Sequence, residues 1–323
     1  MNPSPSEMLV RVARKQPVAT GIALFELVHA EGQLLPPFSA GAHIDVHVPS
    51  GQIRQYSLCN DPRESHRYQI AVLRDPSSRG GSQGMHEQVQ EGQTLRISAP
   101  KNHFPLLADA PQSLLLAGGI GVTPLMSMAA ALGASRAAFE FHYCARSAER
   151  AAFVEQLRSA VWGDRLHLHF DDGPEAQRLK LEVLLSAPSE GQHLYTCGPK
   201  GFMDAVLAQA RLSGWRESQL HYEFFGAAPV VNAADGAFEV EIAATGQVVS
   251  VGATQSIVAA LTTAGVRVPV SCEQGVCGTC LTRVLAGVPD HRDMFLTPEE
   301  QSENRQMLLC CSRAKTPRLV LDL

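Results

Sequence analysis

The chain has 323 residues, a net charge of -5 and 45% hydrophobic residues, which is typical of a folded protein with two or three domains and excludes a largely disordered chain. The negative charge argues against nucleic acid or an anionic membrane surface as a partner. No apolar run reaches the roughly 18 residues of a membrane span, and the first residues lack a signal-peptide pattern. We therefore expect a cytoplasmic protein whose eight cysteines serve as metal ligands or core residues.

Three zones with different hydrophobic periodicity follow one another along the chain. Short alternating segments separated by Gly, Pro and Asn turns fill residues 1–108 and predict an antiparallel β-barrel. Strand and helix patterns alternate through residues 109–226, which predicts an α/β domain with a parallel sheet. We interpret the small-residue segment 227–236 as a linker and residues 237–323 as a compact α+β domain. The fold class is thus multidomain.

The segment "RQYSLCN", residues 54–60, contains side chains that suit a flavin. Arg54 can pair with a phosphate, Tyr56 can stack on the isoalloxazine ring or the ribityl chain, and Ser57 can form a hydrogen bond with flavin N5. The alternative is an edge strand with a surface arginine.

A second segment, "SRGGSQGMHEQV", leads into a predicted helix. The backbone amides of Gly80 and Gly81, together with Ser82, would meet a phosphate at the helix N-terminus. Arg79 beside them can supply positive charge. The two segments together indicate a phosphate-binding site in the first zone.

The segment "LLLAGGIGVTPLMSM" reads as a strand, a glycine-rich turn and a helix. Gly118, Gly119 and Gly121 allow close backbone approach, Thr123 is expected to cap the helix, and Pro124 suits its first turn. This pattern is typical of a nucleotide site, although a tight turn without a ligand has the same residues.

A second nucleotide marker is "TCGPKGFMDAV", where Cys197, Gly198 and Pro199 end a strand and begin a helix. Another strand, "FEFHYCARS", ends where the ribose of an adenosine would lie. Arg146 at that end can hold a 2′-phosphate, so the residues alone leave NADPH open beside NADH.

Histidines alternate in the segment "RLHLHF", which places His167 and His169 on one face of a strand. A metal site would need a third ligand, and none is evident near them in the sequence. We therefore interpret these histidines as structural.

Three cysteines in one loop carry the clearest chemical signal. Cys272, Cys277 and Cys280 have four and then two intervening residues, and Cys310 follows at a distance, which is the plant-type spacing for a two-iron cluster. Zinc is the alternative, but zinc sites usually pair two short Cys-x-x-Cys units on separate knuckles. The spacing therefore favours a 2Fe-2S cluster.

The surroundings of the loop support a cluster and raise one ambiguity. Gly275 and Gly278 let the backbone fold tightly around inorganic sulfides. Cys310 and Cys311 are adjacent, and neighbours in an extended strand face opposite ways, so we expect only one of them to be a ligand.

The segments "CEQGVCGTC", "DHRDMFLTPEE" and "MLLCCSRA", together with the order of flavin, nucleotide and cluster motifs, are similar to the phthalate dioxygenase reductase family of single-chain oxygenase reductases. The similarity covers essentially the whole chain. It implies a flavin barrel, a nucleotide domain and a β-grasp ferredoxin domain. It further implies Cys310 as the fourth ligand, Cys197 beside the nicotinamide, and Glu223 and Phe225 facing the flavin.

The resemblance also implies a function. FMN would replace FAD, and NADH would be the usual donor. Hydride would pass to flavin N5 beside Ser57, and single electrons would pass through the cluster to a separate terminal oxygenase of the Rieske non-haem iron type. We expect a monomer. FAD, NADPH and another acceptor, such as a monooxygenase or a separate ferredoxin, remain alternatives. Two further alternatives are an iron–sulfur redox sensor that binds nucleotide without reacting and a free-flavin reductase or oxidase whose cluster takes no part in the reaction.

Overall fold

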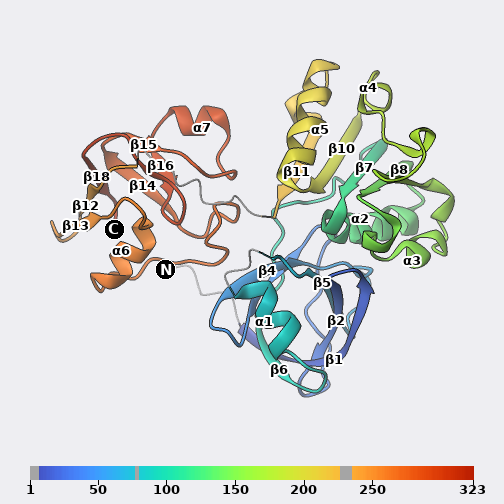
Figure 1. Cartoon of the computed structure of the whole chain (residues 1–323), viewed down its shortest axis with the longest axis horizontal. Coiled ribbons are helices and arrows are strands. Elements are labelled where there is room, and N and C mark those ends of the chain that lie inside the picture. Colours follow the sequence, from blue (N-terminus) through green and yellow to red (C-terminus); the bar gives the residue numbers. More distant parts are fainter. Residues whose placement is uncertain (1–6, 77–79, 226–234) are drawn as a thin grey trace. The chain divides into compact units, whose positions relative to one another are not determined.

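A computed structural model describes residues 7–76, 80–225 and 235–323. The chain divides into two compact units, Met1–Phe225 and Gly226–Leu323, and each is considered by itself (Figure 1). Within the described part of the chain, the helices are all too short or too polar to cross a membrane.

The first unit begins with an antiparallel sheet of six strands in the order β4-β3-β6-β1-β2-β5. The strands are β1 (Glu7–Ala19), β2 (Ile22–His29), β3 (His43–His47), β4 (Ile53–Ser57), β5 (Tyr68–Leu73) and β6 (Thr94–Ser98). A bridge between Leu58 and Ile70 joins the two edges of the sheet. The sheet thereby closes into the predicted barrel, with α1 (Gly81–Gln88) packed beside β5.

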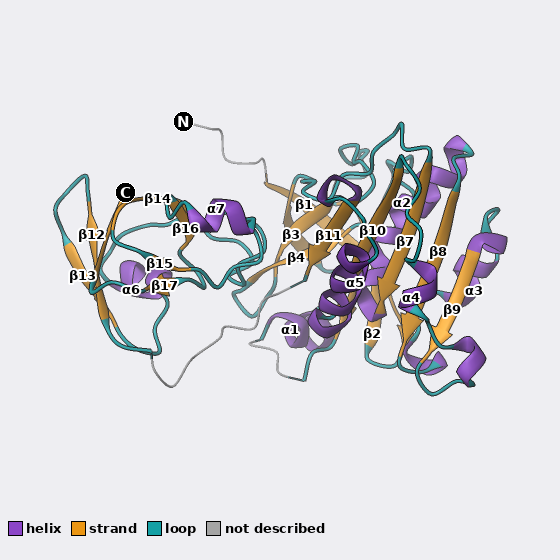
Figure 2. Ribbon diagram, turned by 90° about the horizontal axis from the view of Figure 1, so that it is seen from above, coloured by secondary structure: helices purple, strands orange, loops and turns teal. Residues whose placement is uncertain are grey.

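The remainder of the first unit is a parallel sheet in the order β11-β10-β7-β8-β9 (Figure 2). Its strands are β7 (Gln112–Gly118), β8 (Phe139–Ala145), β9 (Leu166–Phe170), β10 (Gln192–Gly198) and β11 (Leu220–Phe224). Its helices are α2 (Val122–Ser135), α3 (Val154–Arg158), α4 (Leu181–Leu184) and α5 (Lys200–Leu212).

Alternate residues of β7 give the parallel sheet two buried faces. Leu115 and Ala117 pack with α2, whereas Leu114 and Leu116 pack with α5, because successive side chains of a strand point to opposite faces. The α2 side also includes barrel residues such as Leu24, so barrel and parallel sheet share one hydrophobic core.

The second unit contains a mixed sheet in the order β13-β12-β18-β14-β16. Its strands are β12 (Phe238–Ile242), β13 (Val248–Val251), β14 (Leu281–Ala286), β16 (Gln306–Leu308) and β18 (Arg318–Leu321). A separate small ladder joins β15 (Pro289–Asp290) to β17 (Arg313–Ala314), and the helices are α6 (Ile257–Thr263) and α7 (Pro298–Ser302). Helix α6 buries Ile257 and Leu261 in the core under this sheet. The fold class predicted from the sequence is confirmed.

Candidate functional site

A buried polar group joins the barrel to the parallel sheet. Strand β4 ends at Ser57, whose hydroxyl donates a hydrogen bond to Glu223 Oε2 at 3.3 Å. Glu223 on β11 is the register partner of Cys197 on β10. The structure therefore brings together the three residues expected at the hydride-transfer site, although Ser57 is more than a hundred positions away from the other two in the sequence.

Burial favours the uncharged form of the acids in this group. Desolvation raises the pKa of Glu223 to about 8, and the hydrogen bond from Ser57 opposes that shift. Burial raises the pKa of the Cys197 thiol well above its usual range, and the nearby Glu223 adds to the effect. A neutral carboxyl beside a neutral thiol suits contact with uncharged rings, because neither group demands a counterion.

The two nucleotide motifs meet at the carboxyl ends of β7 and β10. The chain runs outward from β7 to β8 and β9 on one side and returns to β10 and β11 on the other, so the strand order reverses between β7 and β10. In parallel sheets, ligands bind in the crevice outside such a switch point. This topology makes the β7–β10 edge the expected nucleotide site.

Glycine is required at this crevice because the two backbones touch. A Cβ on Gly121 would lie 2.2 Å from the carbonyl oxygen of Cys197, and a Cβ on Gly198 would lie 3.0 Å from the Cα of Gly118. Any larger residue would push the two turns apart.

Thr123 does not cap α2, so that prediction was wrong. The turn Gly119–Gly121 forms a short 3-10 helix, and α2 begins at Val122, two residues earlier than a cap at Thr123 implies. Thr123 lies inside the first turn, where its hydroxyl donates to the Ile120 carbonyl at 3.0 Å. Pro124 lies in the first turn, as predicted.

Arg54 lies against the start of α1. Gly80 precedes the helix with a φ of 97°, a conformation that favours glycine. A Cβ on Gly81 would be only 2.6 Å from Arg54 Nε, so the glycine makes room for the guanidinium. The arrangement sets a cation beside the first turn of α1, which fits a phosphate.

The other flavin-segment residues occupy different surroundings. The Ser82 hydroxyl accepts a hydrogen bond from the Asp75 amide at 3.1 Å and can still donate one to a ligand. Tyr56 is half-buried and packs against the barrel core, whereas Phe225 is 37% exposed just beyond β11. Arg79 lies outside the described residues.

A cavity of about 340 Å³ opens near the carboxyl ends of β8 and β9. Its lining includes Asp171, Arg178 and Phe202. The phenyl ring of Phe202 also lies against Gly118, which connects this cavity to the β7 turn. Asp171, directly after β9, was not among the residues predicted from the sequence. Arg146 is exposed and does not line the cavity.

The thiols of the cysteine loop lie close to one another. Cys272, Cys277 and Cys280 are buried between α6 and β14. The Cys272 thiol interacts with that of Cys277, and the Cys280 thiol interacts with that of Cys310. The Gln274 amide also donates to Cys272 Sγ at 3.3 Å. Four clustered thiols with amide donors fit a 2Fe-2S cluster.

The loop glycines are tightly enclosed. Gly275 and Gly278 have φ angles of 74° and 72°. A Cβ on Gly278 would lie 2.4 Å from the Phe295 ring, and one on Gly275 would lie 2.6 Å from Cys311 Sγ. Both positions therefore require glycine for space as well as for conformation.

The expected strand geometry of Cys310 and Cys311 was wrong. Both residues lie in a turn that follows β16, so they do not point to opposite faces of a sheet. Cys311 Sγ lies beside Gly275 and within 3.8 Å of the Ser312 hydroxyl. Cys310, in contact with Cys280, is the better placed fourth thiol.

Comparison with known proteins agrees with this geometry. A protein-family model described as "2Fe-2S iron-sulfur cluster binding domain" matches residues 240–315. This match favours an iron–sulfur cluster over zinc at the four cysteines. The chain is 56% identical to a vanillate O-demethylase oxidoreductase of Pseudomonas putida over 97% of this chain and 98% of the relative. It is 40% identical to the phthalate dioxygenase reductase of Burkholderia cepacia over 97% of each.

Solved structures give the same result. A phthalate dioxygenase reductase, described as a modular structure for electron transfer from pyridine nucleotides to [2Fe-2S], has a TM-score of 0.80 and 39% identity and covers 98% of both chains. An intact self-sufficient cytochrome P450 monooxygenase has a TM-score of 0.82 and 36% identity over 98% of this chain and 41% of its own. The chain belongs to the phthalate dioxygenase reductase family of oxidoreductases.

Proposed function

We propose that this protein is an NADH-dependent reductase that uses FMN and one 2Fe-2S cluster to supply electrons to a separate terminal oxygenase. The observation that carries the proposal is the contact of Ser57, Glu223 and Cys197 beside the β7–β10 switch point, on a chain that also carries a 2Fe-2S domain. A bound flavin supplies the exchange between two-electron hydride chemistry and one-electron transfer.

The residues of the polar group are proposed to orient the Ser57 hydroxyl and to keep negative charge away from the site of hydride transfer. Glu223 accepts the Ser57 hydrogen bond and thereby fixes the hydroxyl at the edge of the barrel, where flavin N5 is proposed to bind. Because Glu223 retains its proton at pH 7, no negative charge opposes arriving hydride. Cys197 offers a compact, neutral surface for the nicotinamide.

Two groups of residues are proposed to hold the nucleotides. The flavin phosphate would be bound by Arg54 and the first turn of α1, and the ring by Tyr56 and Phe225. The dinucleotide would be bound at the two turns of the crevice. The proposed set consists of Arg79, Gly80, Gly81 and Ser82 for the phosphate and Gly118, Gly119, Gly121, Thr123, Pro124, Gly198 and Pro199 for the dinucleotide.

The cavity beside β9 supports NADH over NADPH. Asp171 lines it, and a carboxylate hydrogen-bonds ribose hydroxyls but repels a 2′-phosphate. Arg146, the residue that kept NADPH open, is exposed outside the cavity.

The partner is proposed to be a Rieske-type oxygenase, most simply one of an aromatic O-demethylase system, because of the high identity to vanillate O-demethylase oxidoreductases. We propose a cytoplasmic monomer with domains 1–108, 109–226 and 237–323. The metal ligands are proposed to be Cys272, Cys277, Cys280 and Cys310.

Anaerobic titration with NADH tests the transfer scheme. We expect the flavin absorbance to bleach and the EPR signal of a reduced 2Fe-2S cluster to appear in the same titration. Flavin bleaching without that signal would overturn the scheme. Acid extraction and chromatography of the flavin separate FMN from FAD, and parallel titration with NADPH tests the choice of dinucleotide.

The similarity to a self-sufficient P450 monooxygenase favours a second candidate, a reductase for a haem monooxygenase. The two candidate functions are distinguished by mixing the reduced protein with a Rieske demethylase in one cuvette and with a P450 haem domain in another, and by comparing the rates at which the protein is oxidised. The proposed function requires faster oxidation by the Rieske component.

A further inference from the structure

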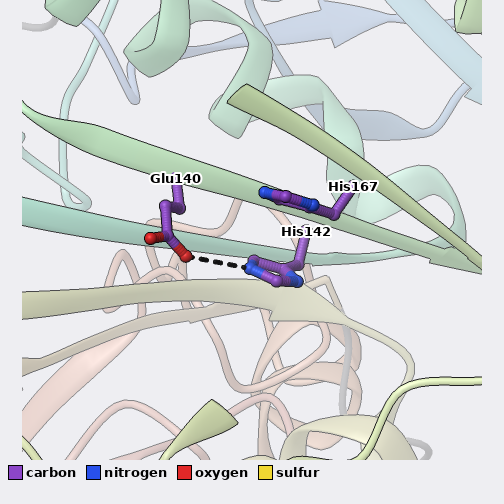
Figure 3. A group of neighbouring side chains, drawn as sticks. All are labelled: Glu140, His142 and His167. Atoms are coloured by element: carbon purple, nitrogen blue, oxygen red, sulfur yellow. Dashed lines mark hydrogen bonds and ion pairs between the residues drawn. The ribbon is translucent and has the colours of Figure 1, made fainter. Parts of the chain in front are cut away.

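One edge of the parallel sheet carries two histidines and a glutamate from neighbouring strands. Glu140 and His142 lie on β8, and His167 lies on the edge strand β9 as the register partner of His142. Figure 3 shows the three side chains side by side. One potential ligand atom from each lies within 4.8 Å of the other two. Strand β8 thus supplies the further potential ligands near His167 that the sequence did not reveal.

A chain of hydrogen bonds determines which nitrogen of His142 carries the proton. The Gln177 carbonyl can only accept, so His169 Nδ1, at 2.9 Å, must donate to it. His169 Nε2 then accepts from His142 Nδ1 at 3.0 Å. With Nδ1 donating in this chain, a neutral His142 ring carries its lone pair on Nε2, the nitrogen that a metal ion would bind.

That lone pair points at another acceptor. His142 Nε2 lies 3.4 Å from Glu140 Oε2, as the dashed line in Figure 3 marks. A cation between these two atoms would accept a lone pair from each of them and offset the charge of the carboxylate. The His167 ring stacks on His142 with ring centroids 4.6 Å apart, and one of its nitrogens lies within 4.8 Å of a ligand atom of each of the other two residues.

The ligand set matches a particular class of ion. Zn²⁺ and related divalent transition metals are commonly bound by two imidazoles and one carboxylate, with a further coordination position open to water. The hydrogen bond from His142 to His169, and from His169 to a backbone carbonyl, is the usual support for a metal-binding imidazole. Glu140 and His167 are exposed, so an ion can enter from solvent.

We propose that Glu140, His142 and His167 form a binding site for a divalent transition-metal ion of the zinc class, independent of the iron–sulfur cluster. Glu140 is the second residue of β8, toward the amino end of the strand, whereas the proposed nucleotide crevice lies at the carboxyl ends of β7 and β10. The bound ion would link the edge strand β9 to β8. It is expected to stabilise the folded state in proportion to its occupancy.

Zinc binding to the intact protein tests the proposal. The holoprotein, with its cluster checked by visible absorbance, is dialysed against Zn²⁺ and studied by X-ray absorption at the zinc edge. We expect about one ion per chain with only nitrogen and oxygen ligands at about 2.0–2.2 Å. Sulfur at about 2.3 Å would place the ion on cysteines and overturn the proposal.

Matched variants locate the site. His167→Ala and Glu140→Gln should abolish the stoichiometric binding, whereas His66→Ala and Glu182→Gln, two exposed controls outside the group, should retain it. His169→Ala should weaken affinity by roughly 10- to 100-fold, because it removes the support of His142. Equal zinc affinity in the natural protein and in His167→Ala would overturn the proposal.

The zinc-binding test does not depend on the proposed reductase function. His167 belongs to neither the crevice nor the cluster, so His167→Ala should reduce its flavin with NADH at the natural rate. Loss of zinc with unchanged reduction supports the metal site, and failure of NADH reduction in the natural protein concerns only the proposed function.

Discussion

The cysteine loop and the Ser57–Glu223–Cys197 group reach their chemistry by different routes. Three of the four proposed cluster ligands lie within nine consecutive positions, and glycines with positive φ shape the loop locally. The polar group instead joins the ends of strands β4, β10 and β11. Damage to the loop should therefore be local and severe, whereas the polar group should respond to changes in packing and protonation.

Removal of a cluster ligand should have the largest effect. Cys310→Ser should lower electron delivery to the oxygenase by about 100-fold or more, because three thiolates hold the cluster poorly. Reduction of the flavin by NADH should persist, since the polar group lies in the other unit. Cluster absorbance and stopped-flow kinetics measure both.

The matched control is Cys311→Ser. This side chain packs beside Gly275, and Cys280 contacts Cys310 instead, so the variant should keep its cluster. Loss of the cluster in Cys311→Ser with retention in Cys310→Ser would reverse the ligand assignment.

An added methyl group at the crevice should have the second-largest effect. In Gly121→Ala the new Cβ meets the Cys197 carbonyl at 2.2 Å, and the overpacking should destabilise the first unit by about 1–3 kcal/mol and slow reduction by NADH. Denaturant unfolding and single-turnover kinetics check the two effects.

Gly201→Ala is the control for that change, because no atom lies within 4 Å of its added Cβ. Its stability should stay within about 0.5 kcal/mol of the natural protein. Equal behaviour of the two variants would mean that close backbone approach does not matter at the crevice.

The protonation of Glu223 should give a pH dependence. With its pKa raised to about 8, the carboxyl loses its proton as the pH rises through that value, and the new charge opposes hydride arrival. If the neutral form reacts, the rate of flavin reduction should fall roughly tenfold between pH 7 and pH 9. Glu223→Gln should show no such fall, and a fall of the same size in both proteins would assign it to another group.

The same carboxyl affects stability in a definite direction. Its pKa rises from 4.5 in the unfolded reference to about 8, so the folded state binds a proton that the unfolded state releases within that window. The free energy of unfolding should therefore decrease as pH rises from 4.5 to about 8, and Glu223→Gln should flatten that slope.

The smallest effect is expected for Ser57→Ala. The variant loses one neutral hydrogen bond, worth about 0.5–1.5 kcal/mol, so flavin reduction should slow by roughly 2- to 10-fold. Because the Ser57 bond holds the Glu223 pKa down, the fall in rate should also move to higher pH. An unchanged rate and pH profile would remove Ser57 from the proposed site.

Cysteine spacing, glycine-rich turns and hydrophobic periodicity were enough to predict three fold types and a 2Fe-2S loop, because each depends on residues close together in the sequence. Chain spacing could not show that Cys310 and Cys311 share a turn, since turn and strand differ only in backbone angles set by neighbouring elements. It also could not show that Asp171 lines a cavity, because that cavity is formed by several segments.

The sequence by itself determined the local chemistry of this protein, namely its cluster loop and the order of its nucleotide motifs. Only the tertiary structure decided which distant side chains meet: Ser57 with Glu223 across the barrel and sheet, and Glu140 and His142 with His167 across two strands. The physical reason is strand pairing. Register between β8 and β9, or β10 and β11, brings side chains together at a spacing that separation along the chain does not encode.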